Sequence, residues 1–572
     1  MSSLQKDDSF LAMLGKHEIE ILKAQLDMVE GNVIERLWQK DFTLWSDSPN
    51  EISNRLDWLE ITKQMENEIE SINSFVKEII DDGYKSVLLL GMGGSSLAPE
   101  VFRLTFGAKT KYLDLEICDS THPDFIKSKM EKFEPANTLY LVSTKSGGTI
   151  ETISFMKHFF NFVADKIGLS EAKKHFVAIT DPGSGLQEMA IKLGFRKIFL
   201  NNPNIGGRFS ALSLFGLVPA ALIGINLSSL LERANKMVEE CRYSNIENIK
   251  FNSAANLGLI IGYLANKGID KLTLNMSQQV KPFGSWAEQL IAESTGKIGK
   301  GILPIDGEEL IEAELYSKDR IFVFITLKGD NTFDEKIIEL SNKNFPVIKI
   351  ILNDVYELGA EFFRWEFATA VAGWLMKLQP FDQPNVESAK VVARSLISEY
   401  KVKGNLPLIE PSLKEGDIEF VGNTDKETLK ECLLNFIEKN LVDGSYITIQ
   451  AFINPIKEAE VELQKLRAAL LKKYKVATTL GFGPRFLHST GQLHKGDSGK
   501  GLFIQFVSDV EHDISIPEDA GKNNSTFTFG VLITAQAFGD RKALQDNNRN
   551  VITIKIKRNI IENISLITKF FE

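Results

Sequence analysis

The feature that most constrains the fold of this chain is a series of short, unbroken apolar runs that end in small or polar residues. Three such runs, SVLLL (86–90), TLYLVS (138–143) and HFVAIT (175–180), are separated by amphipathic stretches. This alternation is typical of strand, loop and helix units in a doubly wound parallel sheet. It predicts an α/β domain over residues 76–235.

The same rhythm returns in the second half of the chain. The runs KLTLNMS (271–277), RIFVFITL (320–327) and FPVIKIIL (345–352) again lie between helical stretches, and they predict a second parallel-sheet domain over residues 236–405. Two similar domains leave a cleft between them. In open parallel sheets ligands bind beyond the carboxyl ends of the strands, so we expect the chemistry in the loops that follow these runs.

At the start of the chain the apolar residues are spaced differently. Residues 1–75 carry apolar side chains at helical spacing, as at Ile19, Leu22, Leu26 and Val29. We therefore expect a helical segment that packs on the domain after it.

Beyond residue 405 the pattern changes again. Apolar runs around one long amphipathic helix predict a third, mixed α/β domain over residues 406–572. The runs are SYITIQAFI (445–453), GLFIQFVSD (501–509), FGVLITAQ (529–536) and NVITIKIKR (550–558), and the helix is KEAEVELQKLRAALLKKY (457–474).

Charge and composition narrow the classes of partner. The 572 residues carry a net charge of −10, from 66 basic and 76 acidic side chains mixed along the sequence, and this balance disfavours a nucleic-acid partner.

The sequence also predicts neither a membrane span nor a signal peptide. No run approaches the roughly 18 apolar residues of a membrane span, and the segment MSSLQKDDSFLAML lacks the features of a signal peptide. Cys118, Cys241 and Cys432 have no spacing typical of a zinc site or a disulfide framework. We expect a cytoplasmic protein without a metal, in which a few donors inside a cleft hold any anionic substrate.

The first apolar run leads directly into the glycine-rich turn Gly91-Met-Gly-Gly-Ser-Ser96. Glycines let the backbone approach an anion, and the hydroxyl groups of Ser95 and Ser96 can donate to it. Taken alone, this turn also suits a nucleotide site or a simple tight turn. The nucleotide interpretation is weakened because Ser96 stands where the dinucleotide fingerprint needs its last glycine, and no Gly-Lys-Ser/Thr of a Walker loop follows.

A second polar loop, Ser143-Thr-Lys-Ser-Gly-Gly-Thr-Ile-Glu-Thr152, ends the run TLYLVS. Thr144, Ser146 and Thr149, with the ammonium group of Lys145, offer directional donors that suit a dianion. These residues could instead cap the next helix, but capping would not require two polar loops at matching strand ends.

The two loops together resemble the sugar isomerase (SIS) domain, whose signature is a Gly-Gly-Ser turn and a Ser/Thr-rich phosphate loop. The resemblance implies a phosphate site built from both loops, with Gly94, Ser95, Thr144, Lys145, Ser146 and Thr149 as substrate-binding residues.

Four further segments narrow this resemblance. They are Gly206-Gly-Arg-Phe-Ser210, Glu293-Ser-Thr-Gly-Lys297, FDQPNVESAK (381–390) and Gly483-Pro-Arg-Phe-Leu-His488. With them, nearly the whole chain resembles phosphoglucose isomerase, and most closely the isomerase half of bifunctional transaldolase/phosphoglucose isomerase proteins. The resemblance implies reversible isomerisation of glucose 6-phosphate and fructose 6-phosphate in glycolysis and gluconeogenesis, without a cofactor and commonly as a homodimer.

This reaction moves a proton between C2 and C1 through an enediol, so one carboxylate that accepts and returns the proton suffices. Glu293 is similar in context to the family's base; otherwise it would be a helix-end carboxylate paired with Lys297. Arg208 matches the arginine whose fixed guanidinium stabilises the enediolate, or else it is held by a backbone carbonyl or a subunit contact. Gln289 lies one helical turn before Glu293 and matches a substrate-contacting glutamine, or else it is a surface residue.

Hexose phosphates are mostly closed rings, and in the family a lysine and a histidine assist ring opening. Gln383 and Lys390 match the family's pattern with its seven-residue spacing, although Pro and Asn replace the usual Trp-Gly after the glutamine. In the family the histidine lies between the catalytic glutamate and this motif, but this chain has no histidine between Glu293 and Gln383. His488 resembles it displaced toward the carboxyl end, in its own or a neighbouring subunit, with His494 as the substitute; both could also be helix-surface histidines.

Two other classes of function were weighed. A phosphosugar sensor would keep the phosphate loops but would have no need for Glu293, Arg208 and Lys390 together. A bifunctional enzyme would need a transaldolase barrel of about 250 residues, whereas only about 75 residues precede the first predicted strand. The sequence therefore favours an isomerase alone.

Overall fold

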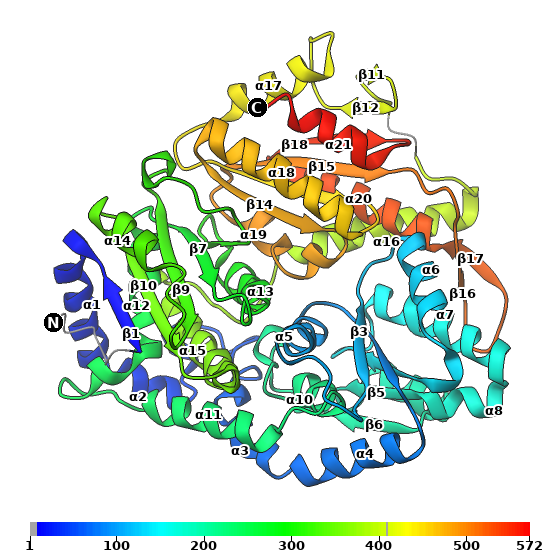
Figure 1. Cartoon of the computed structure of the whole chain (residues 1–572), viewed down its shortest axis with the longest axis horizontal. Helices are drawn as coiled ribbons and strands as arrows, with labels where there is room; N and C mark the ends of the chain where they lie inside the picture. Colours follow the sequence, from blue (N-terminus) through cyan, green and yellow to red (C-terminus); the bar gives the residue numbers. More distant parts are fainter. Residues whose placement is uncertain (1–8, 408–409) are drawn as a thin grey trace.

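The computed structural model describes residues 9–407 and 410–572, so residues 1–8 of the predicted helical segment lie outside it. Figure 1 shows three lobes built on three main sheets: the first in blue and cyan, the second in green and the third in yellow to red. The predicted fold class is confirmed, because two lobes are parallel-sheet α/β domains and the third is mixed α/β. The domain boundaries remain predictions.

The first sheet consists of five parallel strands in the order β3–β2–β4–β5–β6. Its strands are β2 (Ser86–Gly91), β3 (Asp114–Cys118), β4 (Thr138–Ser143), β5 (Phe176–Thr180) and β6 (Lys197–Leu200). Its helices are α4 (Ile69–Asp81), α5 (Leu97–Phe106), α6 (Pro123–Lys132), α7 (Ile150–Ile167), α8 (Leu169–Ala172), α9 (Gly185–Leu193) and α10 (Leu214–Leu222). Residue Gly91 pairs with Ser143, so the two predicted polar loops leave the sheet side by side.

The second sheet has the order β1–β10–β9–β7–β8. Its strands are β1 (Phe10–Met13), β7 (Lys271–Met276), β8 (Leu303–Asp306), β9 (Arg320–Leu327) and β10 (Val347–Leu352). Its helices are α11 (Leu227–Glu240), α12 (Ser253–Asn266), α13 (Phe283–Thr295), α14 (Asp334–Asn342) and α15 (Leu358–Met376). The first strand, β1, runs antiparallel to β10 and the others are parallel.

The start of the chain is therefore less purely helical than its sequence predicts. It forms the edge strand β1 and the helices α1 (Glu18–Glu30), α2 (Val33–Trp38) and α3 (Ile61–Glu66). The buried face of α1 also differs from the predicted stripe: Ile19 is 80% exposed, whereas Gln25 is buried. The physical reason is that the Gln25 amide donates to Asn256 Oδ1 at 2.7 Å, so a polar residue occupies a core position.

The third sheet has six strands in the order β11–β12–β18–β15–β13–β14. Its strands are β11 (Leu413–Glu415), β12 (Ile418–Val421), β13 (Tyr446–Phe452), β14 (Ala477–Phe482), β15 (Gly501–Ser508) and β18 (Asn550–Ile556). Its helices are α16 (Val386–Lys403), α17 (Leu429–Asn440), α18 (Lys457–Tyr474), α19 (Gly491–Gly496), α20 (Phe529–Asp546) and α21 (Ile560–Thr568). The run FGVLITAQ forms the first half of α20. Its apolar residues are buried where α20 packs against α16 and the third sheet.

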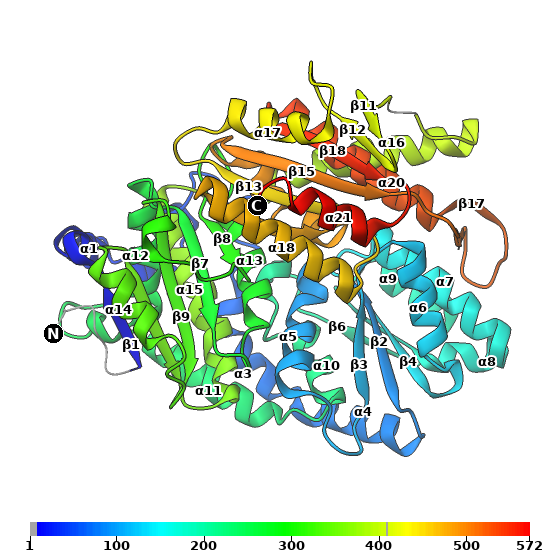
Figure 2. The ribbon, with the colours of Figure 1, turned by 45° about the horizontal axis from the view of Figure 1, so that its top comes forward.

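The three lobes meet around α13. This helix packs against α5 of the first lobe and α19 of the third, while α16 packs on α20. A small hairpin, β16 (Ser515–Pro517) and β17 (Ser525–Thr528), extends from the third lobe onto α7, as Figure 2 shows at the right. Among the residues described, no helix is both long and apolar enough to cross a bilayer.

Candidate active site

Two glycines of the first predicted loop allow parts of all three lobes to meet. A Cβ on Gly94 would lie 2.0 Å from the carbonyl oxygen of Gly207, in the turn that carries Arg208. Gly93 adopts φ +55°, and a Cβ there would lie 2.9 Å from Nε2 of Gln289 and 3.0 Å from the carbonyl oxygen of His488. Only glycine permits such approaches, so this turn is the point where the predicted site residues converge.

Glu293, near the end of α13, faces the Arg208 guanidinium. The Glu293 Oε1 and Arg208 Nη1 atoms are 3.5 Å apart, and Gln289 Nε2 donates to Glu293 Oε2 at 3.2 Å. Gln289 is buried rather than on the surface, and its Oε1 has no partner among the residues described.

Four further contacts hold the Arg208 guanidinium in place. It donates to Ser294 Oγ at 2.8 Å, to Gln383 Oε1 at 2.9 Å and to the carbonyl oxygens of Pro380 and Asp382. Burial lowers the pKa of Arg208, with the Glu293 carboxylate acting in the opposite direction. A buried cation fixed by this many acceptors keeps one orientation, which suits it to meet a developing negative charge.

Lys297 does not pair with Glu293. Its ammonium group donates to the carbonyl oxygens of Gln379 and Asp382 and to Asp382 Oδ1, at 2.8, 2.6 and 2.6 Å. Burial lowers the pKa of Lys297 to about 8. Lys297 therefore stabilises the loop that carries Gln383. Glu293 instead contacts Arg208 and Gln289.

His488 reaches the site from a single 3₁₀ turn, Arg485–His488, between β14 and α19. Its Nε2 lies 3.0 Å from Oε1 of Glu151, at the start of α7. Gln536 of α20 donates to the same Glu151 oxygen at 2.7 Å and accepts a 2.8 Å hydrogen bond from Thr121. Burial acts to raise the pKa of Glu151, but the contact with His488, a backbone hydrogen bond and the charge of Lys390 together lower it.

His494 has different surroundings. Its ring lies between Phe486 and Phe503, and its Nε2 has no partner among the residues described. Burial lowers the pKa of His494 well below its usual value. A neutral histidine enclosed by aromatic rings fits the core of the third lobe.

A cavity of about 250 Å³ joins the second polar loop to His488. Its lining includes Ser146 and Thr149 of the loop, Glu151, Lys390 of α16 and His488. The loop and the two predicted ring-opening residues therefore open onto one space.

Within the second polar loop, the hydroxyl groups of Thr144 and Thr149 lie 3.2 Å apart. Thr149 is the N-cap residue of α7, yet its side chain makes no capping hydrogen bond, and the same holds for Ser96 at the start of α5. The Lys145 ammonium group is paired with Asp181 and the carbonyl oxygen of Pro203. Helix capping thus does not account for the hydroxyl groups of this loop.

Two residues at the site were missed by sequence reasoning. Glu151 belongs to the quoted loop Ser143–Thr152, so its place in that loop was the available signal. Gln536 lies in a run interpreted only as apolar, and nothing local marks it as a neighbour of Glu151.

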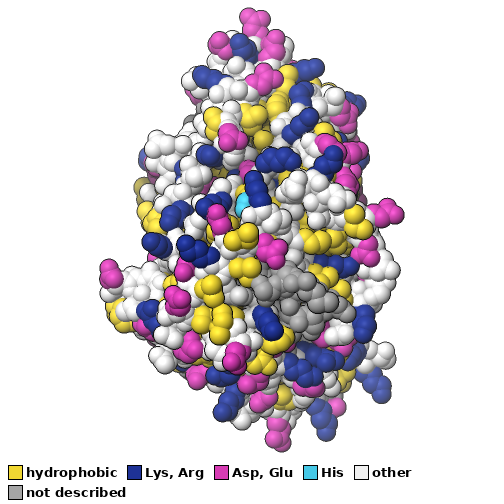
Figure 3. Space-filling view, turned by 90° about the vertical axis from the view of Figure 1, so that its left-hand side faces the viewer, with side chains coloured by type: hydrophobic (Ala, Val, Ile, Leu, Met, Phe, Trp, Pro, Cys, Tyr) yellow, Lys and Arg dark blue, Asp and Glu magenta, His cyan; other side chains and the backbone are white. Residues whose placement is uncertain are grey.

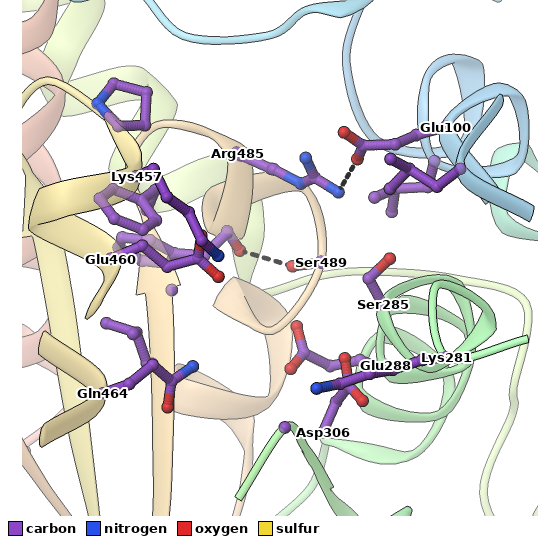
Figure 4. Close-up of a pocket in the computed structure, with 18 of the residues that line it drawn as sticks. Glu100, Lys281, Ser285, Glu288, Asp306, Lys457, Glu460, Gln464, Arg485 and Ser489 are labelled. Atoms are coloured by element: carbon purple, nitrogen blue, oxygen red, sulfur yellow. Dashed lines mark hydrogen bonds and ion pairs between the residues drawn. The ribbon is translucent and has the colours of Figure 1, made fainter. Parts of the chain in front are cut away.

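A larger cavity of about 1130 Å³ lies on the opposite side of the Arg485–His488 turn. Figure 4 shows Lys281, Ser285, Glu288 and Asp306 on one side of it. Burial, followed by the nearby Asp306 carboxylate, raises the pKa of Glu288 to about 8, and burial raises the pKa of Asp306 to about 6. Glu288 lines this larger cavity, whereas Glu293 of the same helix does not.

No group of three or more His, Cys, Asp or Glu side chains within the described parts of the chain is arranged to hold a metal ion. The donors gathered around Glu293 and His488 are guanidinium, amide, hydroxyl and imidazole groups, which suit an oxygen-rich organic anion.

Comparison with known proteins places these residues in a family context. The family model described as phosphoglucose isomerase matches residues 34–303. A glucose-6-phosphate isomerase of Campylobacter jejuni is 28% identical over 373 residues, which cover 57% of this chain and 89% of the relative. One from Methanocaldococcus jannaschii is 28% identical, with 56% and 86% covered. These matches cover less of the chain than the predicted resemblance, and they leave its likeness to the bifunctional proteins unconfirmed.

Solved structures share the fold. A hypothetical protein from Thermus thermophilus superposes with a TM-score of 0.57 at 22% identity, covering 68% of this chain and 99% of that one. A glucose-6-phosphate isomerase from Chlamydia trachomatis gives a TM-score of 0.51 at 19% identity, with 69% and 86% covered. Almost a third of this chain lies outside each superposition.

Proposed function

Since the chain belongs to the phosphoglucose isomerase family, we propose that it interconverts glucose 6-phosphate and fructose 6-phosphate through an enediol. The observation that carries the proposal is the ion pair, at 3.5 Å, between Glu293 and a buried Arg208 whose guanidinium makes four other hydrogen bonds. The first polar loop touches the turn that carries Arg208, and the second polar loop begins beside the first. Together the two loops supply the donors for a phosphate group.

Glu293 acts as the base that moves the proton between C2 and C1. Negative charge then builds on the O1 and O2 atoms of the sugar. Arg208 stabilises it, because its guanidinium is held in place before the reaction and cannot lose its proton. Gln289 has one unsatisfied amide oxygen beside Glu293, which can accept a hydrogen bond from a sugar hydroxyl group.

Ring opening requires that one proton is added to the ring oxygen and that another is removed from the O1 hydroxyl group. His488 performs this exchange, with Glu151 holding its Nε2 nitrogen so that Nδ1 is available to the substrate. Lys390 lines the same cavity and assists, and Gln383 links the Arg208 turn to the segment leading into α16.

The phosphate group is held by the two polar loops. Gly94 lets the backbone approach closely, and Ser95, Thr144, Ser146 and Thr149 donate hydrogen bonds. Lys145 contributes positive charge from the edge of the second loop. This arrangement binds the 6-phosphate away from the reacting carbons.

The remaining assignments follow from the same proposal. The protein acts in the cytoplasm in glycolysis and gluconeogenesis, without a cofactor, as a homodimer. On the face seen in Figure 3, basic and acidic side chains are mixed, which gives no support to a nucleic-acid partner.

The direct test is solvent exchange at C2. In D2O without added metal, the enzyme should place deuterium at C2 of glucose 6-phosphate, because the base exchanges its proton with solvent during the enediol stage. Glu293→Gln should abolish both isomerisation and exchange while sugar-phosphate binding persists. Retention of more than about a tenth of the wild-type rate would remove Glu293 as the base.

A further inference from the structure

The turn that carries His488 belongs to the third lobe, but His488 contacts Glu151 of the first lobe and Gln289 of the second. It follows β14, the edge strand of the third sheet, and precedes α19. The turn at Gly93 lies close to the His488 backbone, and this approach is possible because Gly93 has no side chain. The segment Gly483–Ser489 is called the histidine loop below.

Paired charges anchor the histidine loop to the first lobe. The Arg485 guanidinium forms ion pairs with Glu100 of α5 and, at 3.1 Å, with Asp119 beyond β3. Figure 4 shows Arg485 extended across the gap toward Glu100. Although burial acts to raise the pKa of Glu100, the Arg485 guanidinium lowers it. A partly buried cation shared by two carboxylates would leave both uncompensated if the loop withdrew.

Hydrogen bonds and close packing anchor the same loop to the second lobe. Gln289 Nε2 donates to the carbonyl oxygen of His488 at 2.6 Å. Just beyond the loop, Gln492 donates to the carbonyl oxygen of Gly296 at 2.9 Å. A Cβ on Gly296 would lie 2.3 Å from the Cα of Leu493, so backbone meets backbone here.

The third anchor is Glu151, which takes hydrogen bonds from two separate parts of the third lobe. His488 approaches from the histidine loop and Gln536 from α20. Both reach the one Oε1 atom of a carboxylate that is nearly fully buried. The space beside Glu151 is thus filled by the chain's own third lobe.

From these three anchors we propose that the third lobe completes the active site in cis. His488 serves Glu293 and Arg208 of its own chain, so a single chain is a self-sufficient isomerase whether or not it dimerises. The role of His488 rests on the function proposed above, whereas its placement in cis rests on the anchors alone. A second copy could supply this histidine only by displacing the loop and breaking all three sets of contacts.

Mixing two variants, one inactive and one slowed in turnover of the closed-ring sugar, tests the proposal. Glu293→Gln and His488→Ala chains should be co-expressed, purified together and assayed against each variant alone. A site built in cis gains nothing from mixing, so the mixture should show no more activity than the two variants separately. If the histidine came from a partner, half of the randomly formed dimers would be mixed and one site in each would be intact, restoring about a quarter of wild-type activity. That recovery would overturn the proposal.

A crosslinking measurement gives an answer that does not depend on activity. A chain carrying Glu151→Cys and His488→Cys should be treated with a short bifunctional thiol reagent and its mass measured under denaturing conditions. The native cysteines are buried, and wild type sets the background. A product with the mass of one chain supports placement in cis, and a product with twice that mass refutes it.

The matched control for crosslinking is Glu151→Cys with His494→Cys. His494 lies six residues away in sequence but its ring is enclosed in the third lobe, so this pair should not link. If wild type failed to isomerise glucose 6-phosphate, the proposed function would fall, while the crosslink mass would still decide which chain supplies residue 488.

Discussion

The close contact between Gly94 and the Arg208 turn leads to a sharp prediction for Gly94→Ala. The added Cβ would lie 2.0 Å from the carbonyl oxygen of Gly207, whereas ordinary contact begins near 3.4 Å. The turn carrying Arg208 must therefore retreat by about 1.4 Å, because both partners in the clash are close to backbone and neither can rotate away.

A shift of this size matters because Arg208 must face the enediolate oxygens. Misplacing a catalytic group by about 1 Å can cost a factor of roughly 10² in rate, which corresponds to about 2.7 kcal/mol in the barrier. We expect kcat/KM of Gly94→Ala to fall by roughly this factor in a coupled assay with glucose 6-phosphate. The unfolding midpoint should be measured in parallel, so that loss of folded protein is separated from loss of catalysis.

The matched control is Gly206→Ala, in the same turn. A Cβ there would find its nearest neighbours at 3.7 Å, on Arg55 and Phe209, and the backbone φ of −67° suits alanine. This variant should keep nearly full activity. If folded Gly94→Ala lost less than about threefold in kcat/KM, or if Gly206→Ala lost as much, the argument from close contact would be refuted.

The remaining predictions concern the two histidines and the larger cavity. His488→Ala should slow turnover of glucose 6-phosphate supplied as the closed ring. His494→Ala should lower the unfolding midpoint and leave turnover of the folded fraction nearly intact. If His494→Ala slowed turnover more than His488→Ala, the two roles would have to be exchanged. Burial and Asp306 raise the pKa of Glu288 to about 8, so the folded state binds a proton that the unfolded state releases near pH 4.5, and stability falls as the pH rises between these values. As the pH is raised from about 5 to about 8, Glu288→Gln should avoid this loss and gain roughly 3–4 kcal/mol in stability relative to wild type, measured by urea unfolding. Parallel curves would contradict the assignment.

Local patterns were sufficient for most of the fold. Runs such as SVLLL and RIFVFITL are apolar at almost every position, and a strand buried on both faces needs such a run whatever surrounds it. The run FGVLITAQ is also rich in apolar residues but forms a helix, which packs against α16 and the third sheet. Edge strand β1 escaped notice for a related reason: four residues pair with β10 only because the fold brings that edge to them.

Most residues of the candidate site were likewise proposed from short local motifs. Glycine turns, hydroxyl-rich loops and a Glu-Ser-x-Gly-Lys context depend on neighbours within a few residues, so their resemblance to family motifs was enough to select Glu293, Arg208 and the phosphate loops for testing. These motifs specify what each segment can do. They do not specify which segments meet.

Only the tertiary structure decided how those segments combine. It separated His488 from His494, although six positions apart, by directing one into a cavity beside Glu151 and enclosing the other between aromatic rings. It also assigned Lys297 to a loop rather than to Glu293, and it brought Gln536 to a carboxylate 385 positions earlier. Contacts over such separations arise from the docking of whole lobes, a sum of many surfaces that no local pattern contains.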